Sequence, residues 1–472
     1  GNRLLFEEVN RSMSLAFSYS WTFGNRFGFI RNCQLRNLGA ESTHVSVLDG
    51  IQNLLPAGID QSFQLRYSNL GDAYKKAELS DREKIGIFYL SSIPTDRAEP
   101  SEGLRATVVW QQGLDDPTVL LSSKQLDRFR DGMSVAEEHD IRGHRGAYFT
   151  VSQHELAGHS AQPSSTEPQV SWNLVANVNR DHTDVVNLQK LLSESAGIES
   201  LITSDVAENE RRLLAIVSAA DGRQAGNNQL RVQRHQSNVL FNVLRGGIPQ
   251  HQYSISASDF HSHLLQFNRH AAERNPDFLA RIANEPNLNL DDLMAEAIQT
   301  GDQDLQRISL EYLPLTYSRR HGDPTRPWNA FSIDCFNANG TESLCYEGNW
   351  RDIFQNWEAL ALSFPGFSRN MVFRFLNAST ADGYNPYRIS EDGFEWETPD
   401  PNDPWGNIGY WGDHQIIYLL KLLEWSQRFH PAELDRYLAT ECCAYAQVPY
   451  RIRDYRSIQK NPQETIDYDY EL

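Results

Sequence analysis

A loop rich in Trp, Tyr, Asp, Asn, Gly and Pro separates two apolar helical stretches between residues 346 and 425. Its acidic and aromatic side chains include Asp403, Trp405, Trp411 and Asp413. Carboxylates accept hydrogen bonds from hydroxyl groups, and aromatic faces pack against C–H groups, so the two together are what a sugar pocket needs. The stretch therefore predicts a carbohydrate site.

The helix expected to begin at Trp350 carries planar hydrogen-bonding groups opposite its apolar stripe. Apolar residues recur at helical spacing and predict one buried face: Ile353, Phe354, Trp357, Leu360 and Ala361. The opposite arc holds Arg351, Asp352, Gln355, Asn356 and Glu358. An arc without Lys that presents amide, guanidinium and carboxylate groups suits sugar hydroxyls. A solvated helix face is the plain alternative, but the acidic and aromatic cluster downstream favours a sugar-binding role.

A second helix is expected to start near Asp413 and to be apolar almost all round. Its apolar residues predict a helix buried inside a large domain: Ile416, Ile417, Tyr418, Leu419, Leu420, Leu422, Leu423 and Trp425. Asp413 follows Gly412, so one interpretation makes it the N-cap of this helix. The other places its carboxylate at the floor of a cavity, between Trp411 and His414. Both interpretations fit the residues.

The run GNWRDIFQNWEAL, followed by NPYRISEDG and NDPWGNIGYWGDHQIIYLL, resembles the cellobiose phosphorylase family and related inverting enzymes on an (α/α)6 toroid. The resemblance covers roughly residues 320–430. In that family an Arg-Asp motif opens one barrel helix, and a loop with an Asn-Asp pair and a Trp leads into an inner helix. The family also has an N-terminal β-sandwich, which would suit the first third of this chain.

The resemblance implies roles for the residues of this stretch. Arg351 and Asp352 would contact the sugar on the non-reducing side of the scissile bond, and Asp403, Trp405 and Asp413 would line the same pocket. We therefore expect Asp403 and Asp413 as catalytic candidates. The expected substrate-binding residues are Arg351, Asp352, Gln355, Trp405, Trp411 and His414.

Inverting cleavage requires a carboxylic acid that protonates the leaving oxygen, and hydrolysis also requires a second carboxylate that activates water. In an inverting phosphorylase, phosphate attacks instead, so inorganic phosphate is the only co-substrate to consider and no cofactor is expected. This chain lacks the GDWND-type motif that carries the family's general acid. Asn356 also stands near a position where the family has an acid.

The helices that follow the resemblance complete only part of a toroid. Either the helices of residues 184–300 close the ring in an unusual order, or the polypeptide is one part of a longer enzyme. The second interpretation is favoured. A missing part of the same enzyme is then an expected partner, as is a second copy of the chain.

The net charge excludes two classes of partner. The 472 residues include 62 Asp and Glu against 43 Lys and Arg, a formal net charge of -19. Such a field disfavours nucleic acids and anionic membrane surfaces, whereas a neutral oligosaccharide is unaffected by it. Phosphate would need a local basic pocket, for which Arg319, Arg320 and His321 are the candidates.

The five cysteines are too few and too scattered for a disulfide framework, so a reduced cytoplasm is the expected location. The first residues do not lead into the apolar run of a secretory signal, and no run approaches the roughly 20 apolar residues of a membrane span. No HExxH, CxxC or glycine-rich phosphate loop occurs. His261 and His263 would point away from each other on a helix, so no metal site is expected.

Periodicity predicts a multidomain β plus α protein. Residues 1–160 contain short alternating runs between turn signals, which predict an antiparallel β-sandwich. Residues 161–180 begin with a Pro- and Ser-rich run and are predicted to be a linker. From Asp184 the period is helical, so residues 181–472 are expected to form an α-helical domain that resembles an (α/α)6 toroid, complete or incomplete.

Three functions remain open. A glycoside hydrolase or glycoside phosphorylase, or a large fragment of one, would cleave a bond of an oligoglucoside and would bring Asp352, Asp403 and Asp413 together in an aromatic-lined cleft. A sugar-binding protein would have the same cleft without a correctly placed acid. A structural protein would pack the Trp-rich loop as core. The β-domain could itself bind carbohydrate, although a structural role for it is favoured.

Overall fold

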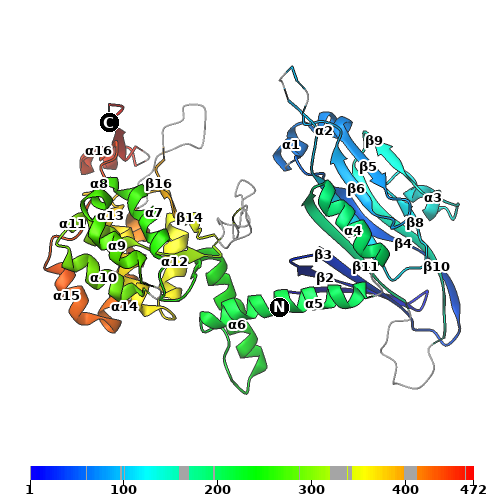
Figure 1. The fold of residues 1–472 in the computed structure, drawn as a ribbon, viewed down its shortest axis with the longest axis horizontal. Coiled ribbons are helices and arrows are strands. Elements are labelled where there is room, and N and C mark those ends of the chain that lie inside the picture. The colour runs from blue at the N-terminus through cyan, green and yellow to red at the C-terminus, as the bar shows by residue number, and fades with distance from the viewer. Residues whose placement is uncertain are drawn as a thin grey trace. The chain divides into compact units, whose positions relative to one another are not determined.

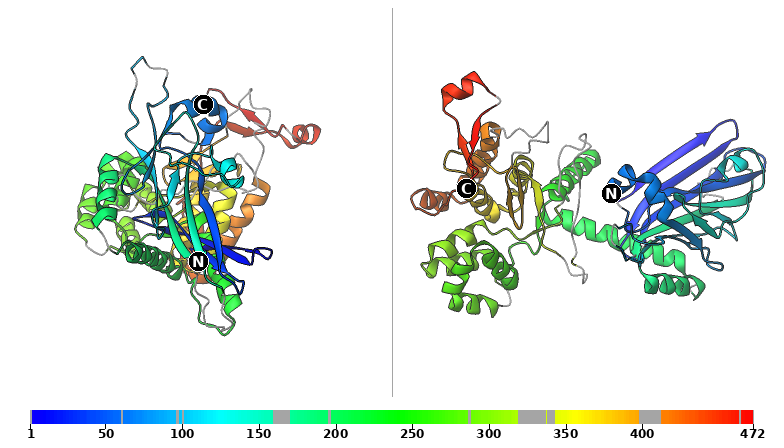
Figure 2. Two further views of the ribbon diagram at one scale, coloured as in Figure 1. Left: turned by 90° about the vertical axis from the view of Figure 1, so that its right-hand side faces the viewer. Right: turned by 90° about the horizontal axis from the view of Figure 1, so that it is seen from above.

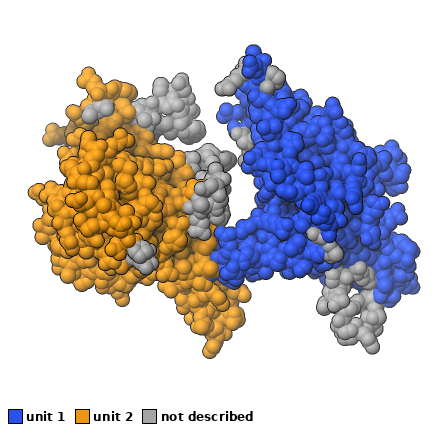
Figure 3. Space-filling view, viewed as in Figure 1, with its two compact units in different colours: residues 1–214 blue, residues 215–472 orange. Residues whose placement is uncertain are grey.

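The computed structural model describes residues 2–59, 61–95, 98–99, 101–158, 170–194, 197–285, 288–318, 337, 343–397, 412–462 and 464–471. Residue 61 and residues 412–415 are described by their backbone alone. The chain divides into two compact units, Gly1–Leu214 and Ala215–Leu472 (Figure 3). The separation of a β-rich part from a helical part confirms the multidomain β plus α class.

The first unit is built around an antiparallel sheet that has eight strands within the described residues (Figure 1). In spatial order these are β1 (Leu4–Asn10), β2 (Leu15–Gly24), β3 (Gly28–Asn37), β11 (Val170–Arg180), β7 (Ala106–Gln112), β6 (Gly86–Leu90), β5 (Lys75–Leu79) and β9 (Asp140–Arg142). The predicted alternation is confirmed in β2, where Ala16, Ser18 and Ser20 are buried and the residues between them are half-buried.

The linker predicted over residues 161–180 is wrong in its second half. β11 begins at Val170 and lies in the interior of the sheet, in register with β3 on one side and β7 on the other. Trp172, Leu174 and Val175 are buried there. The Pro- and Ser-rich composition that predicted a linker belongs to residues 162–168, which lie outside the described residues. The residues that follow them are rich in Val, Trp and Leu, which is typical of a strand and not of a linker.

A smaller antiparallel sheet contains β4 (Thr43–Leu54), β10 (Gly146–Leu156) and β8 (Thr118–Leu120). Its residues Val119 and Tyr148 share one core with Leu35 and Leu174 of the larger sheet. Gly50 allows β4 to approach β10 closely, because a Cβ there would lie 2.1 Å from the Tyr148 carbonyl oxygen. One hydrophobic core therefore joins the two sheets.

Two helices, α4 (His182–Glu194) and α5 (Ile198–Ala219), cover the other face of the larger sheet. Successive residues of a strand point to opposite faces. Leu174 belongs to the core shared by the sheets, whereas Val175 packs with Val185 of α4 and Ile202 of α5. The remaining helices of this unit are α1 (Gln61–Arg66), α2 (Ser68–Tyr74) and α3 (Leu126–Arg130).

The predicted start of the α-helical domain at residue 181 is therefore too early in the chain. The division between the compact units follows Leu214, inside α5. The spacing of the apolar residues from Val185 predicts a helix, and the structure confirms it as α4. Its apolar stripe packs on the sheet of the first unit, so α4 belongs to the β-rich part of the chain.

The second unit is mainly helical (Figure 2). Its helices are α6 (Gln229–Gly246), α7 (Ala257–Phe267), α8 (Arg269–Arg274), α9 (Pro276–Ala283), α10 (Leu290–Gln299), α11 (Gln303–Glu311), α12 (Trp350–Leu360), the 3-10 helix η1 (Pro365–Phe367), α13 (Ser368–Asn377), α14 (Gly412–Phe429), α15 (Pro431–Leu438) and α16 (Tyr455–Lys460). Short antiparallel pairs join β12 (Ile248–Pro249) to β13 (Leu315–Thr316), β15 (Arg388–Ser390) to both β14 (Glu347–Asn349) and β16 (Gly393–Glu395), and β17 (Tyr450–Ile452) to β18 (Ile466–Tyr468).

One core runs through the second unit and contains Phe260, Leu293, Ile308, Trp357 and Met371. The helix expected over residues 258–274 is divided into α7 and α8 at Asn268, whose backbone is extended. The side chain of Asn268 caps α8 by accepting a hydrogen bond from the Ala271 N–H at 3.0 Å. In the described part of the chain, no helix has the length and apolar character of a membrane span.

α14 differs from the expected buried helix. Its residues Ile416, Ile417 and Leu420 are 59%, 50% and 52% exposed, whereas Leu422 is fully buried. Within the described residues, α12, α13 and α15 pack against α14, and they cover only the side of the helix that carries Leu422. The composition predicted an apolar helix correctly, but burial depends on how many neighbours surround it.

Candidate functional site

The aromatic stripe of α12 holds this helix in the core. Trp350, Phe354 and Trp357 are at most 1% exposed. Their ring centroids lie 4.7 Å apart for the first pair and 4.8 Å apart for the second. The Trp357 Nε1–H donates to the carbonyl oxygen of Gly246, at the end of α6, over 2.7 Å. Ring packing and this hydrogen bond together determine which way the opposite side of α12 faces.

The three predicted substrate-binding residues of α12 lie on that opposite side. Arg351 and Gln355 are exposed, and the Asp352 side chain is 13% exposed. The Arg351 Nε donates to Asp352 Oδ1 at 3.3 Å. A guanidinium and an amide that are open to solvent and a largely buried carboxylate are therefore grouped at the start of the helix.

Asn356 does not belong to this polar face, contrary to the sequence prediction. It is 3% exposed, and its Nδ2 donates to the Asp352 carbonyl oxygen at 2.5 Å. Its Cβ lies 3.2 Å from the position that a Cβ on Gly246 would take. The end of α6 therefore covers this edge of α12, and the exposed arc is narrower than the helical period indicates.

A small sheet connects α12 with the first part of the loop that follows α13. β15 pairs with both β14 and β16, and the Trp350 N–H donates to the Tyr387 carbonyl oxygen at 3.0 Å. Arg388 forms ion pairs with Glu347 at 2.5 Å and Glu395 at 3.0 Å. These contacts place residues 387–395 directly beside the start of α12.

The other predicted site residues lie outside what the structure describes. Asp403, Trp405 and Trp411 lie outside the described residues. Asp413 and His414 fall in the first turn of α14, and their side chains lie outside the description. The phosphate candidates Arg319, Arg320 and His321 also lie outside it.

Two carboxyl groups that the sequence patterns did not single out lie close together in the second unit. Glu391 follows β15, and its backbone N–H donates to the Tyr346 carbonyl oxygen at 3.0 Å. Asp259 lies on α7, and its carboxylate accepts a hydrogen bond from the Tyr312 hydroxyl. Each side chain is partly buried, and their negative charges interact. The acidic Glu391-Asp392 pair directly after β15 is visible in the sequence, but its proximity to α7 is not.

This environment raises the pKa of both groups. Burial raises the pKa of Glu391 to about 8, and the charges of Asp259 and Asp392 act in the same direction. Burial also raises the pKa of Asp259, while its hydrogen bond from Tyr312 opposes the rise. Glu391 is therefore mainly protonated at neutral pH, the state from which a carboxyl group can donate a proton.

A buried arginine lies beneath Glu391. Arg374 is 0% exposed, and its Nη2 donates to the carbonyl oxygens of Ser390 at 3.1 Å and Glu391 at 3.3 Å. Its guanidinium carbon lies 4.7 Å from the Phe267 ring centroid and 4.6 Å from that of Phe394. The cation thus fixes the backbone that carries Glu391, and the two rings shield it from water.

Replacing Glu391 with Gln should alter the pH dependence of stability. Because the folded pKa of Glu391 is about 8 against an ordinary 4.5, its favourable contribution is complete below about pH 4.5 and is lost as pH rises through about 8. Gln mimics the protonated form, so the variant should lose less stability over this range. Urea midpoints measured across the range test this. Asp382→Asn, at an exposed loop position, is the control, and equal slopes for the parent and the Glu391 variant would contradict the expectation.

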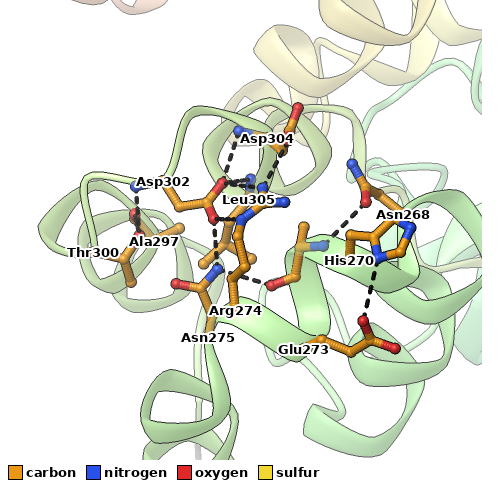
Figure 4. A network of polar contacts seen from close by, with 11 residues as sticks. Asn268, His270, Glu273, Arg274, Asn275, Ala297, Thr300, Asp302, Asp304 and Leu305 are labelled. Atoms are coloured by element: carbon orange, nitrogen blue, oxygen red, sulfur yellow. Dashed lines mark hydrogen bonds and ion pairs between the residues drawn. The ribbon is translucent and has the colours of Figure 1, made fainter.

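A second polar network ties α8 to α11 (Figure 4). Asp302 caps α11 by accepting hydrogen bonds from the N–H groups of Asp304 at 3.0 Å and Leu305 at 3.1 Å. Arg274 donates through Nε to Asp302 at 2.9 Å and through Nη2 to Asp304 at 2.7 Å. The hydrogen bond from Arg274 lowers the pKa of Asp302 to about 2. The charged groups of this network form hydrogen bonds and ion pairs with one another, so we interpret the network as structural.

Residues 250–314 match the family model for glycoside hydrolase family 149 insertion domain 1. We call this part of the chain, from residue 250 to residue 314, the insertion-like segment. It contains α7 to α11. It also contributes Asp259 to the carboxyl pair and Arg274 and Asp302 to the polar network of α8 and α11. The match shows that this segment is similar to a domain found in a glycoside hydrolase family.

Among solved structures, one similar chain is a candidate kojibiose phosphorylase from the human microbiome. The two are 9% identical, the comparison covers 83% of this chain and 37% of that chain, and the TM-score is 0.25. This chain therefore spans well under half the length of that relative. No curated protein matches the sequence.

The insertion-like segment is bound to α13 by polar contacts. Asn370 Nδ2 donates to the Tyr312 carbonyl oxygen at 2.9 Å, and Asn377 Nδ2 donates to Glu311 Oε2 at 3.1 Å. Arg369, which is 6% exposed, pairs with Asp291 at 2.6 Å. Asp259 belongs to the segment and Glu391 does not, so the carboxyl pair lies at the border between the segment and the rest of the second unit.

Proposed function

We propose that this chain acts on a glycosidic bond of an oligoglucoside, by phosphorolysis or hydrolysis with inversion, either alone or as part of a longer enzyme. The observation that carries the proposal is the match of the insertion-like segment to a glycoside hydrolase domain. The resemblance of the α12 region to cellobiose phosphorylases points to the same class independently, and the two regions share one hydrophobic core.

In this proposal the start of α12 holds the sugar. Arg351, Asp352 and Gln355 would bind hydroxyl groups on the non-reducing side of the scissile bond, because charged and amide groups bind hydroxyls directionally. Trp405, Trp411 and His414 would complete the pocket. Asp403 and Asp413 remain the catalytic candidates from the sequence.

The reaction needs one proton donor. Phosphate, or a water molecule activated by a carboxylate, attacks the anomeric carbon while a carboxylic acid protonates the leaving oxygen from the other side. A donor must hold its proton at the working pH. Glu391 is held in that state by its surroundings, so we add it to Asp403 and Asp413 as a candidate for this step.

The same proposal treats the two sheets of the first unit as the N-terminal β-sandwich of such enzymes and the helices of the second as part of a toroid. The remaining part of the enzyme or a second copy of the chain would be the protein partner. Cys33, Cys442 and Cys443 carry free thiols, which is in keeping with a reducing cytoplasm.

Replacing Asp352 with Asn should reduce kcat/KM by about 100-fold, because the charge that strengthens its hydrogen bonds to the sugar is removed. Oligoglucosides are incubated with the protein, with and without inorganic phosphate, and released sugar and sugar phosphate are measured. Sugar phosphate that forms only with phosphate identifies a phosphorylase. Asp435→Asn, the same change at an exposed position of α15, is the matched control and should leave the rate unchanged.

Two outcomes would contradict the proposed cleavage, and a third would contradict the role given to Asp352. Binding of oligoglucosides without turnover under any condition would favour the sugar-binding alternative. Absence of both binding and turnover would favour a structural protein. Equal loss of activity in the Asp352 and Asp435 variants would show that the effect is not specific to the start of α12.

A further inference from the structure

The first unit contains a hollow of about 540 Å3 that the proposed cleavage reaction does not use. It lies where the loop between β7 and β8 meets the end of β10 and the start of β11, so both sheets contribute to it. Its polar lining includes Asp115, Asp116, Ser152, Gln153, His154 and Ser171. The volume falls within the range of about 300–1,000 Å3 that small-molecule sites occupy.

An imidazole ring forms a fixed part of the wall. The His154 ring lies nearly parallel to that of the buried Trp172, at 10° and 6.5 Å between centroids. Its Nε2 is 2.8 Å from the Ser152 hydroxyl oxygen. Stacking and this hydrogen bond hold the ring in place. Burial lowers the pKa of His154, so the ring is neutral at neutral pH.

The loop that carries the two carboxylates is held close to β11. Gly113 has a φ of +104°, and a Cβ there would lie 2.7 Å from the Ser171 carbonyl oxygen, so only glycine suits this position. Asp116 adopts a φ of +36°, which is uncommon for a residue with a side chain. Non-glycine residues in such conformations cluster at binding sites. The backbone therefore holds Asp115 and Asp116 at the rim of the hollow.

The chemistry of the lining restricts the ligand. Two carboxylates repel anions such as phosphate. Within the described residues, no group of three or more His, Cys, Asp and Glu could hold a metal ion. Carboxylates, an amide, hydroxyls and a neutral imidazole together provide donors and acceptors for a neutral molecule with many hydroxyl groups.

We propose that this hollow is an oligosaccharide-binding site separate from the cleavage site. Asp115 and Asp116 would accept hydrogen bonds from the hydroxyl groups of a neutral glucan chain, and the Gln153 amide would donate and accept them, with the His154 ring as part of the wall. The choice of a glucan as ligand rests on the proposed function. The site itself requires no turnover.

The test measures binding of cellotetraose and maltotetraose to the full chain by titration calorimetry. The double variant Asp115→Ala, Gln153→Ala should bind at least one of them about tenfold more weakly, because it removes a charged and a neutral hydrogen-bonding group. Both residues are exposed, so the fold should be unaffected. The control is Asp131→Ala, Gln52→Ala, which changes the same residue types at exposed positions outside the hollow.

Unchanged binding in the double variant, an equal loss in the control, or no binding of either tetraose to the parent would each overturn the proposal. Turnover of a disaccharide is measured in parallel and should be the same in all three proteins. Loss of binding in the double variant with no turnover in any protein would leave this site in place and remove only the proposed cleavage function.

Discussion

Replacing Trp357 with Ala should lower the free energy of unfolding of the second unit by about 3–5 kcal/mol. The side chain is 0% exposed and packs against Phe354 and Tyr346. Its loss leaves a cavity and also leaves the Gly246 carbonyl oxygen without the indole N–H that now lies 2.7 Å away. Amide hydrogen exchange in α6 and α12 measures the effect, and exchange should become roughly two to four orders of magnitude faster.

Two further variants separate packing from general damage. Trp357→Phe keeps an aromatic ring and loses the hydrogen bond, so it should cost less than Trp357→Ala. Trp425→Ala removes a half-buried indole that stacks on Phe429 in α14, and it should leave exchange in α6 unchanged. Equal effects of Trp357→Ala and Trp425→Ala on α6 would show that Trp357 does not anchor α12 to that helix.

Replacing Asp49 with Ala should destabilise the first unit by about 3–5 kcal/mol, because a buried cation loses its partner. Asp49 lies on β4 and accepts hydrogen bonds from Arg31 at 2.6 Å and from the Trp172 indole at 2.9 Å, both on the larger sheet. Burial alone would lower the pKa of Arg31, and Asp49 raises it above its ordinary value. Without Asp49, the Arg31 guanidinium would stay charged beside the Tyr19 ring, 4.3 Å from its centroid.

The thermal unfolding midpoint and hydrogen exchange in β3 and β11 measure this effect. The double variant Arg31→Met, Asp49→Leu should recover much of the loss, because apolar residues of similar size can replace a buried ion pair. Asp127→Ala is the matched control. It breaks an ion pair with Arg130 in which the side chains are 88% and 71% exposed, so it should cost about 0–1 kcal/mol. A loss for Asp49→Ala as small as that of the control would contradict the expectation.

The sequence indicated the type of most elements but not their neighbours. The period of two in residues 14–21 and the helical stripe from Val185 both correspond to elements of the predicted kind. The stripe of α4 nevertheless covers a sheet, although its period fits a helical domain equally well. β11 was not predicted because a Pro- and Ser-rich run precedes it. The average composition of residues 161–180 is dominated by that run, and this hides the strand that begins at Val170.

The candidate site could be predicted from the sequence where the direction of a side chain depends only on its position in one helix. Arg351, Asp352 and Gln355 face away from the core because the 3.6-residue period places them opposite Trp350, Phe354 and Trp357. The same period predicted an exposed Asn356, and α6 buries it. The proximity of Asp259 to Glu391 joins two segments distant in the chain, which no periodicity can indicate.

The sequence by itself determined the β-rich and helical parts, the apolar stripe of α12 and the polar side of that helix, because these depend on spacing within one element. Only the tertiary structure decided that α4 belongs to the first unit, that one side of α14 remains exposed, and that Glu391 holds its proton at neutral pH. Spacing shows which side of an element is apolar. What covers that side, and how much water a carboxyl group loses, depends on segments that meet only when the chain folds.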